Sequence, residues 1–331
     1  MPKFLLLRFS SIGDIVLTTP VIRCLKQQVP GAEVHVLTRK PFESTLKHNP
    51  YIDCLHTFEA SPSECREALH AHRFDGIIDL QHNRRTWLMK QWLNKPAQGT
   101  YSFRKLNIEK WLLVNFKIDR LPKMHIVDRY LETVAPFGVK NDGKGLDFFI
   151  DTESRKSIDR LPDSHRTSYV AVAIGAQHAT KRLPTEKMIA ICKKIGRPIV
   201  LLGGKDDSTT GETIASAVGT TVVSLCGKLS LGESAALLER ARVVLTHDTG
   251  LMHIAAALKR PVVSVWGNTV PEFGMTPYYG DADVASTVFQ VNGLSCRPCT
   301  KIGFQKCPKG HFKCMALQDE DRIAAAVRAS L

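Results

Sequence analysis

The sequence predicts an α/β protein built from two Rossmann-like, doubly wound halves that face a central cleft. Short runs of leucine and β-branched residues alternate with helical patterns along the whole chain, as parallel sheets covered by helices require. The 331 residues exceed what one hydrophobic core usually supports, and a polar stretch with Gly and Pro occupies 140–166. We therefore expect one domain at 1–160 and another at 161–331.

Eight segments have the length and composition of buried strands. They are Phe4–Phe9, Glu33–Thr38 and Gly76–Leu80 in the first half, and Tyr169–Ile174, Pro198–Leu202, Val222–Leu225, Val243–Thr246 and Val262–Trp266 in the second. Ser230 and Glu233 have the spacing of a capping box, so a helix should run from there to Arg240. Asp319–Leu331 is expected to form a closing helix. In such folds ligands bind at the carboxyl ends of the strands.

Composition narrows the class of protein. Hydrophobic residues make up 44% and charged residues 23%, which excludes a disordered chain. The apolar run Phe4–Leu7 is too short for a signal peptide, and no stretch approaches the ~18 uninterrupted apolar residues of a membrane span. Nine cysteines without an export signal are expected to be thiols or metal ligands. We expect a cytoplasmic protein whose membrane contact is peripheral.

Positive charge is concentrated between residues 81 and 130. The net charge of the chain is +13, and this stretch holds eleven Lys or Arg against three acids, together with Trp87, Trp92 and Trp111. Basic residues mixed with aromatics suit an anionic amphiphile or a membrane surface. A solvated basic face or a nucleic-acid site would fit the charge as well. Arg84 and Arg85 are the first candidates for acidic acceptor groups, because guanidinium pairs bidentately with phosphate.

The first predicted strand leads into the turn Ser10–Pro20, SSIGDIVLTTP. Backbone N–H groups and a helix start favour a phosphate or developing negative charge there, although neither a dinucleotide fingerprint nor a Walker loop is present. Ser11 and Gly13 are candidate acceptor-binding residues. Asp14 is the candidate for chemistry, and its position also fits a carboxylate that only complements the helix dipole.

A second turn follows the predicted strand Val243–Thr246, in the segment HDTGLMHIAAALKRPVVSVWG. Asp248 and Thr249 are expected to cap a helix whose N–H groups near Gly250 could hold a diphosphate. An ordinary βα turn would have the same appearance. His253 should lie one turn into this helix, where a lone histidine is more often a packing residue.

These two segments resemble the motifs of glycosyltransferase family 9, the ADP-heptose:lipopolysaccharide heptosyltransferases. The first match is R-x-S-S-I-G-D-I-V-L-T-T-P, and the second is T-H-D-T-G-L-M-H-I-A-A-A-L-x-x-P-V-V-x-V-x-G. The resemblance implies a metal-independent inverting enzyme with the two-domain GT-B fold. It also implies that Asp14 is the catalytic base, that Asp248, Thr249 and Gly250 form the diphosphate turn, and that His253 supports it.

Two weaker matches extend the resemblance. Ile174–Pro184 is similar to the family's G-x-x-x-x-x-K-x-W-P turn, which would make Lys181 the lysine that neutralises donor phosphate, although Leu183 replaces the usual aromatic residue. Leu201–Asp206 resembles the turn whose acid bonds the donor ribose, so Asp206 is the counterpart and the neighbouring Asp207 an alternative. The D-x-D sequence Asp281–Asp283 is interpreted as surface charge.

The resemblance implies transfer of heptose from ADP-L-glycero-D-manno-heptose to the lipopolysaccharide inner core, at the inner face of the cytoplasmic membrane. Domain 1–160 would bind the acceptor and domain 161–331 the donor, without a cofactor. The order of heptose addition and the identity of the sugar stay open. The alternatives are a GT-B nucleotide-sugar epimerase and a non-catalytic protein that binds anionic lipid or nucleic acid. Of these two ligands of the non-catalytic alternative, we do not expect nucleic acid to be a partner.

A cysteine-rich tail precedes the closing helix. Cys296, Cys299, Cys307 and Cys314 have the spacing C-x2-C-x7-C-x6-C, with His311 nearby. Four thiols in so short a segment could form a structural zinc site. The spacing is not that of a standard zinc module, and we predict no metal.

Overall fold

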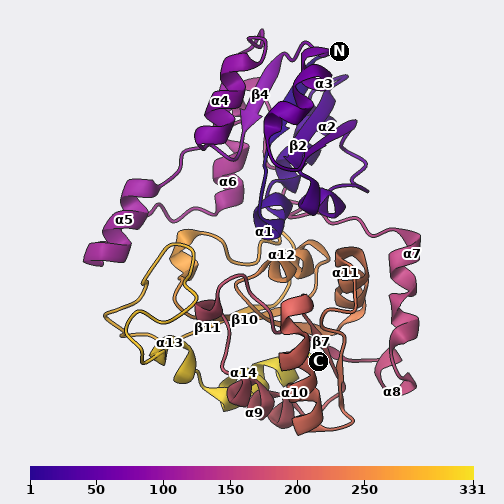
Figure 1. Ribbon diagram of the computed structural model, residues 1–331, viewed down its shortest axis with the longest axis vertical. Helices are drawn as coiled ribbons and strands as arrows, with labels where there is room; N and C mark the ends of the chain where they lie inside the picture. Colours follow the sequence, from indigo (N-terminus) through magenta and orange to yellow (C-terminus); the bar gives the residue numbers. More distant parts are fainter. The chain divides into compact units, whose positions relative to one another are not determined.

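The computed structural model describes all 331 residues, which form two compact units (Figure 1). The first unit comprises Met1–Lys105, Met124–Phe149 and Gly280–Ala282, and the second comprises Leu106–Lys123, Ile150–Tyr279 and Asp283–Leu331. The segment Leu106–Lys123 thus belongs with the C-terminal sheet rather than with the N-terminal one. The division at 160/161 and the roles given to the two domains stay predictions.

The first unit contains a five-stranded parallel sheet in the order β3-β2-β1-β4-β5. Its strands are β1 (Lys3–Leu7), β2 (Glu33–Arg39), β3 (Cys54–Phe58), β4 (Gly76–Asp79) and β5 (Thr100–Ser102). The three strands expected here are confirmed, and β3 and β5 are additional. The chain runs outward from β1 to β3 and then returns to place β4 on the other side of β1, which makes the β1/β4 junction a topological switch point.

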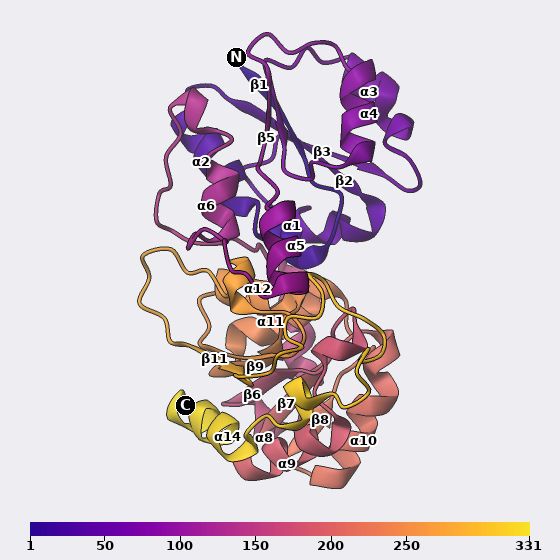
Figure 2. The same cartoon turned by 90° about the vertical axis from the view of Figure 1, so that its left-hand side faces the viewer.

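Helices cover both faces of this sheet. They are α1 (Ile12–Val16), α2 (Thr19–Gln28), α3 (Arg66–His70), α4 (Arg84–Trp92) and α6 (Ile126–Leu131), with short 3-10 turns at Lys40–Thr45, Pro62–Cys65 and Ala135–Phe137. Figure 2 shows α2 and α6 on one face and α3 and α4 on the other. On the latter face Leu5, Leu7 and Leu37 pack beneath Leu69 and Met89.

The second unit contains a six-stranded parallel sheet in the order β11-β10-β9-β6-β7-β8. Its strands are β6 (Val170–Ala173), β7 (Ile199–Leu202), β8 (Val222–Ser224), β9 (Val243–His247), β10 (Val262–Trp266) and β11 (Ser286–Gln290). All five expected strands are confirmed, and β11 is additional. The switch point lies between β6 and β9, because β7 and β8 extend to one side and β10 and β11 to the other.

Two helical layers sandwich the second sheet (Figures 1 and 2). The larger layer consists of α9 (Thr185–Ile195), α10 (Ser208–Val218), α13 (Lys313–Ala316) and α14 (Glu320–Ala329), whose apolar side chains form one core with the strands. The opposite layer consists of α11 (Leu231–Arg240) and α12 (Gly250–Ala257). The remaining helices are α5 (Asn107–Phe116), α7 (Thr152–Arg155) and α8 (Asp163–Arg166), and 3-10 turns occupy Lys156–Arg160, Ala179–Lys181, Lys205–Asp207 and Pro271–Phe273.

Two helix predictions are confirmed in detail. The Glu233 carboxylate accepts a hydrogen bond from the Ser230 N–H at 2.7 Å, and the Ser230 hydroxyl accepts one from the Glu233 N–H at 3.2 Å, at the start of α11. Asp319 caps α14 by accepting from the Arg322 N–H at 3.0 Å. The doubly wound α/β prediction is therefore correct in both units.

None of the helices combines the length and apolar character needed to cross a bilayer.

Candidate functional site

Asp14 lies on α1, directly after the carboxyl end of β1 and therefore at the first switch point. Its Oδ1 is 2.7 Å from Nη2 of Arg8. Its Oδ2 accepts hydrogen bonds from the Ser11 N–H at 3.2 Å and from the Ser11 hydroxyl at 2.8 Å. Gly13 is buried, whereas the Asp14 side chain is 25% exposed. The carboxylate is thus held on both oxygens and still reaches the surface.

Arg8 is the residue that fixes this carboxylate, and sequence reasoning gave it no role. Its guanidinium is buried and donates to the Ser10 and Leu80 carbonyl oxygens and to the Tyr130 hydroxyl at 3.0, 2.5 and 2.9 Å. Burial acts to lower the pKa of Arg8, but Asp14 and Tyr130 outweigh burial and raise it. Arg8 follows β1 and Leu80 follows β4. Arg8 therefore links the ends of both strands of the switch point to Asp14.

The turn after β4 carries Arg84 and Arg85. Asp79, at the end of β4, is buried and accepts hydrogen bonds from the His82 N–H at 2.6 Å and from Lys90 Nζ at 2.7 Å. These contacts fix the turn, and both arginines are exposed at the first two positions of α4. They are placed where an anionic group could reach them, and their role in acceptor binding stays a prediction.

The second unit brings together three turns at its own switch point. Lys181, in the turn after β6, donates from Nζ to Oδ2 of Asp248 at 2.5 Å. Asp248 follows β9, and the same oxygen accepts a hydrogen bond from the Thr269 hydroxyl, beyond β10, at 2.9 Å. The side chains of Lys181 and Asp248 are 16% and 12% exposed. Two of the predicted donor-site residues are therefore in direct contact, and Thr269 joins them without having been predicted.

The start of α12 differs from the expectation in one respect. Thr249 occupies the N-cap position, but its side chain makes no capping hydrogen bond, and Asp248 is engaged by Lys181 and Thr269 instead. The expected Asp/Thr side-chain cap is thus wrong, because the tertiary ion pair takes the carboxylate. The N–H groups at Gly250 are left without a side-chain cap, as an anion site requires. His253 is buried within α12.

The turn after β7 carries two neighbouring acids, Asp206 and Asp207, which differ in burial and in contacts. Asp207 is buried, accepts from the Gly204 N–H at 2.9 Å and lies 3.0 Å from Nη1 of Arg182. Asp206 is exposed. Since Asp207 is committed to the local backbone and to Arg182, Asp206 is the carboxylate of this pair that presents itself to solvent.

Two buried polar residues near these turns also escaped the sequence analysis. His247 ends β9, and its Nε2 accepts a hydrogen bond from the Leu183 N–H at 3.0 Å, so it fixes the turn that carries Lys181. Burial lowers the pKa of His247 to about 4. Asn268 is 2% exposed, and neither its amide nitrogen nor its amide oxygen has a partner. A polar residue at the end of a buried strand, or within two residues of it, was the available signal for both.

The basic, Trp-bearing stretch is divided between the two units. Trp87 lies on α4 of the first unit and is 56% exposed, and Trp111 lies on α5 of the second unit and is 54% exposed. Trp92 is half-buried against the core of the first unit. In the second unit the segment of α5 is anchored by Leu113, which packs against Val270 and Phe273.

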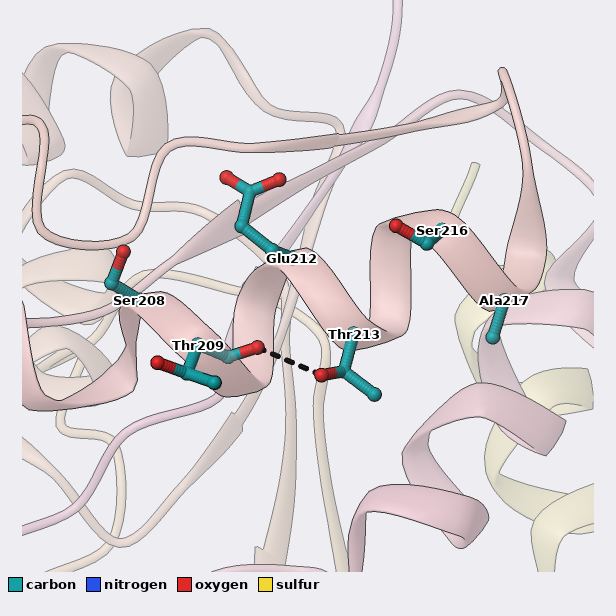
Figure 3. Close-up of a pocket in the computed structure, with 6 residues that line it drawn as sticks. All are labelled: Ser208, Thr209, Glu212, Thr213, Ser216 and Ala217. Carbon is teal, nitrogen blue, oxygen red and sulfur yellow. Dashed lines mark hydrogen bonds between the residues drawn. The ribbon is translucent and has the colours of Figure 1, made fainter.

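Three further features remain, of which the cysteine-rich tail contacts the turn after β10, since the Cys299 N–H donates to the Asn268 carbonyl oxygen at 3.3 Å. Asp281 and Asp283 are exposed. In the tail, all four cysteines are free thiols, and Sγ of Cys296 is 3.8 Å from Nε2 of His311. A shallow, open surface depression is lined only by residues of α10, and Figure 3 shows their polar side chains along that single helix, with Thr213 donating to the Thr209 carbonyl oxygen at 2.9 Å.

Known proteins similar to this chain identify its family and agree with its fold. Residues 63–305 match the family model of glycosyltransferase family 9 (heptosyltransferase). Lipopolysaccharide heptosyltransferase 3 of Escherichia coli is 26% identical over 275 residues, which cover 78% of this chain and 81% of that relative.

Two solved structures share the fold. The family 9 glycosyl transferase from Veillonella parvula has a TM-score of 0.79 and 22% identity, covering 99% of this chain and 97% of that one. The E. coli heptosyltransferase WaaC with ADP has a TM-score of 0.71 and 20% identity, covering 99% of this chain and all (100%) of that one. The chain therefore has the GT-B fold, belongs to glycosyltransferase family 9 and is a glycosyltransferase.

Proposed function

We propose that this protein transfers heptose from ADP-L-glycero-D-manno-heptose to the inner core of lipopolysaccharide, with inversion at the anomeric carbon. The observation that carries the proposal is the pairing of Lys181 with Asp248 beside an uncapped helix start, at the switch point of the second sheet. That arrangement suits a diphosphate. The similar proteins support the ligand class, since one is named for lipopolysaccharide and another was solved with ADP.

Asp14 is the proposed general base. The acceptor hydroxyl oxygen would attack the anomeric carbon while Asp14 takes its proton, and the bond from that carbon to the diphosphate oxygen would break through an oxocarbenium-like state. The Arg8 guanidinium at 2.7 Å holds the carboxylate in place. The 25% exposure of Asp14 leaves it accessible to a hydroxyl.

The leaving ADP requires no proton, because a diphosphate departs as a stable anion. Lys181 and the N–H groups at Thr249 and Gly250 would stabilise its charge, while His253 supports the turn and Asp206 bonds the ribose. Asp248 itself would not contact the diphosphate. A carboxylate next to a diphosphate would repel it, so Asp248 is best assigned to positioning Lys181 through the 2.5 Å ion pair.

The acceptor would be bound by Ser11, Gly13, Arg84 and Arg85. The exposed arginines at the start of α4 offer bidentate contacts to acidic groups of the lipopolysaccharide core. Exposed aromatic residues in the same basic stretch, Trp87 and Trp111, would support peripheral contact with the inner membrane from the cytoplasm.

Release of ADP from ADP-heptose, measured with and without heptose-deficient lipopolysaccharide, tests the proposal. Asp14→Asn should reduce acceptor-dependent release about 10²- to 10⁴-fold, because a positioned base contributes a factor of that size. ADP affinity, measured by calorimetry, should be unchanged. Asp281→Asn is the matched control, since Asp281 is an exposed acid of the same unit, and it should retain full turnover.

The same experiment separates the alternatives. A nucleotide-sugar epimerase would convert or hydrolyse the donor at the same rate without acceptor. A lipid-binding protein would bind lipopolysaccharide and release no ADP under any condition. Full turnover by Asp14→Asn would remove Asp14 from the role of base.

A further inference from the structure

Three histidines gather on the first sheet, away from the turn that carries Asp14. His35 lies on β2, His56 on the adjacent strand β3, and His72 follows α3 just before β4. One nitrogen of each imidazole lies within 4.8 Å of the corresponding nitrogen of the other two. His35 and His56 are buried, and His72 is half-buried. The proposed transfer reaction uses none of them.

The nitrogens of this triad lie near the spacing of metal ligands. Nδ1 of His35 is 2.9 Å from Nε2 of His56. The ring of His72 lies 4.5 Å from that of His35 and 6.0 Å from that of His56, centroid to centroid. In a tetrahedral site with Zn–N bonds of about 2.0–2.1 Å, ligand nitrogens are separated by roughly 3.3 Å. Small side-chain rotations would bring the three nitrogens to that spacing.

A carboxylate orients the central histidine. Nε2 of His35 is 2.8 Å from Oε1 of Glu33, and the other oxygen of Glu33 pairs with Nζ of Lys3 at 2.9 Å. A ligating histidine usually donates its second ring N–H to such a carboxylate, which fixes the tautomer and directs the opposite nitrogen to the metal. In His35 that arrangement directs Nδ1 toward His56.

We propose that His35, His56 and His72 bind one divalent transition-metal ion, with Zn²⁺ as the metal whose preferred ligands and coordination number fit best. Imidazole suits Zn²⁺, and a water molecule would complete four-coordination. The ion would cross-link β2, β3 and the segment before β4, and would thereby stabilise the first unit. Hydrogen bonding accounts for the His35–His56 contact, and packing of the His72 ring on His35 and Phe74 is the alternative to a metal for the third imidazole.

The test uses tag-free, full-length protein that is first depleted of metal with a chelator. Zn²⁺ is added, excess metal is removed, and bound metal is measured by elemental analysis together with the midpoint of thermal unfolding. We expect His72→Gln to bind one equivalent less than the unsubstituted protein and to lose the rise of the midpoint on Zn²⁺ addition. His72 is half-buried, so this variant is better suited to folding than His56→Gln.

Two controls separate this site from other ligands. His70→Gln changes a histidine that stacks on Trp92 outside the triad, and it should leave the bound metal unchanged. Cys299→Ser changes the thiol cluster of the tail and should preserve the His72-dependent equivalent. With Co²⁺ in place of Zn²⁺, that equivalent should lack thiolate-to-cobalt charge-transfer absorption. Equal metal content in His72→Gln and the unsubstituted protein would overturn the proposal.

Discussion

Replacing Lys181 by Met tests whether this lysine serves catalysis or only the fold. The substitution leaves Asp248, which is 12% exposed, with Thr269 as its remaining donor. Breaking a fully buried ion pair costs ~3–5 kcal/mol because the remaining charge is uncompensated. Partial exposure and the Thr269 hydrogen bond reduce this figure, so we expect the free energy of unfolding to fall by roughly 2–3 kcal/mol.

The double variant Lys181→Met/Asp248→Asn separates the two effects. It removes the uncompensated carboxylate, and Asn can still accept from Thr269, so the free energy of unfolding should return to within about 1 kcal/mol of the starting protein. Activity should not return. Loss of one group that stabilises transition-state charge lowers kcat by about 10²- to 10³-fold, and the double variant should retain that defect.

Urea unfolding measures the stability of both variants, and acceptor-dependent ADP release measures their activity. Asp206→Asn is a useful companion, because Asp206 is exposed and its proposed contact is with the ribose; it should raise KM for the donor with little change in kcat. If the double variant regains both stability and full turnover, Lys181 only holds the fold and the assignment of the leaving-group site fails.

Arg8, Asn268 and His247 each carry a separate expectation. Arg8→Lys keeps the charge but loses the planar fork that positions Asp14, so kcat should fall about 10²-fold with unchanged ADP affinity; unchanged kcat in steady-state kinetics would contradict this. Asn268→Ala removes a buried amide whose polar atoms have no partner, so the midpoint of thermal unfolding should stay unchanged or rise, whereas a lower midpoint would show that the amide stabilises the fold. The pKa of His247 is about 4 in the folded protein and about 6.5 when unfolded. The unfolded chain therefore binds more protons as pH falls, and up to about 3 kcal/mol of stability present above pH 6.5 should be lost toward pH 4. His247→Asn should flatten that loss in urea unfolding at pH 7 and 4.5, and an unaltered pH dependence would refute the assignment.

Strands buried on both faces were predictable, whereas of the edge strands β3, β5, β8 and β11 only β8 was predicted. All residues of β6 and β10 are buried, so their sequences are continuous apolar runs. β5 and β11 lie at sheet edges, and their residues are exposed or half-buried. Their sequences, TYS and STVFQ, carry polar residues that a single pattern cannot distinguish from a loop. The sequence of β3 also mixes polar and apolar residues, because β3 is an edge strand as well.

The positions of the candidate site residues followed from topology, whereas their partners did not. Asp14, Lys181 and Asp248 each follow a strand next to a switch point, and the order of the strands dictates that location. The contact of Asp248 with Thr269 depends on β9 and β10 being neighbours with a defined register. Local spacing predicted that the Asp248 carboxylate caps a helix. In the structure Lys181, 67 residues away in sequence, pairs with that carboxylate instead.

The two ion pairs at the switch points differ in which member, the acid or the cation, is available to a ligand. In the first, Arg8 is 9% exposed and its partner Asp14 is 25% exposed, so the acid is the member that can reach a ligand. In the second, Lys181 is 16% exposed and Asp248 12%, and Asp248 receives a further hydrogen bond from Thr269. Because the carboxylate already has two donors, we propose that the lysine is the member that meets a ligand. An accessible acid held by a fixed cation, as in the Asp14–Arg8 pair, suits removal of a proton. An accessible cation held by a fixed acid, as proposed for the Lys181–Asp248 pair, suits stabilisation of a departing anion. Transfer from a nucleotide-diphosphate sugar requires both.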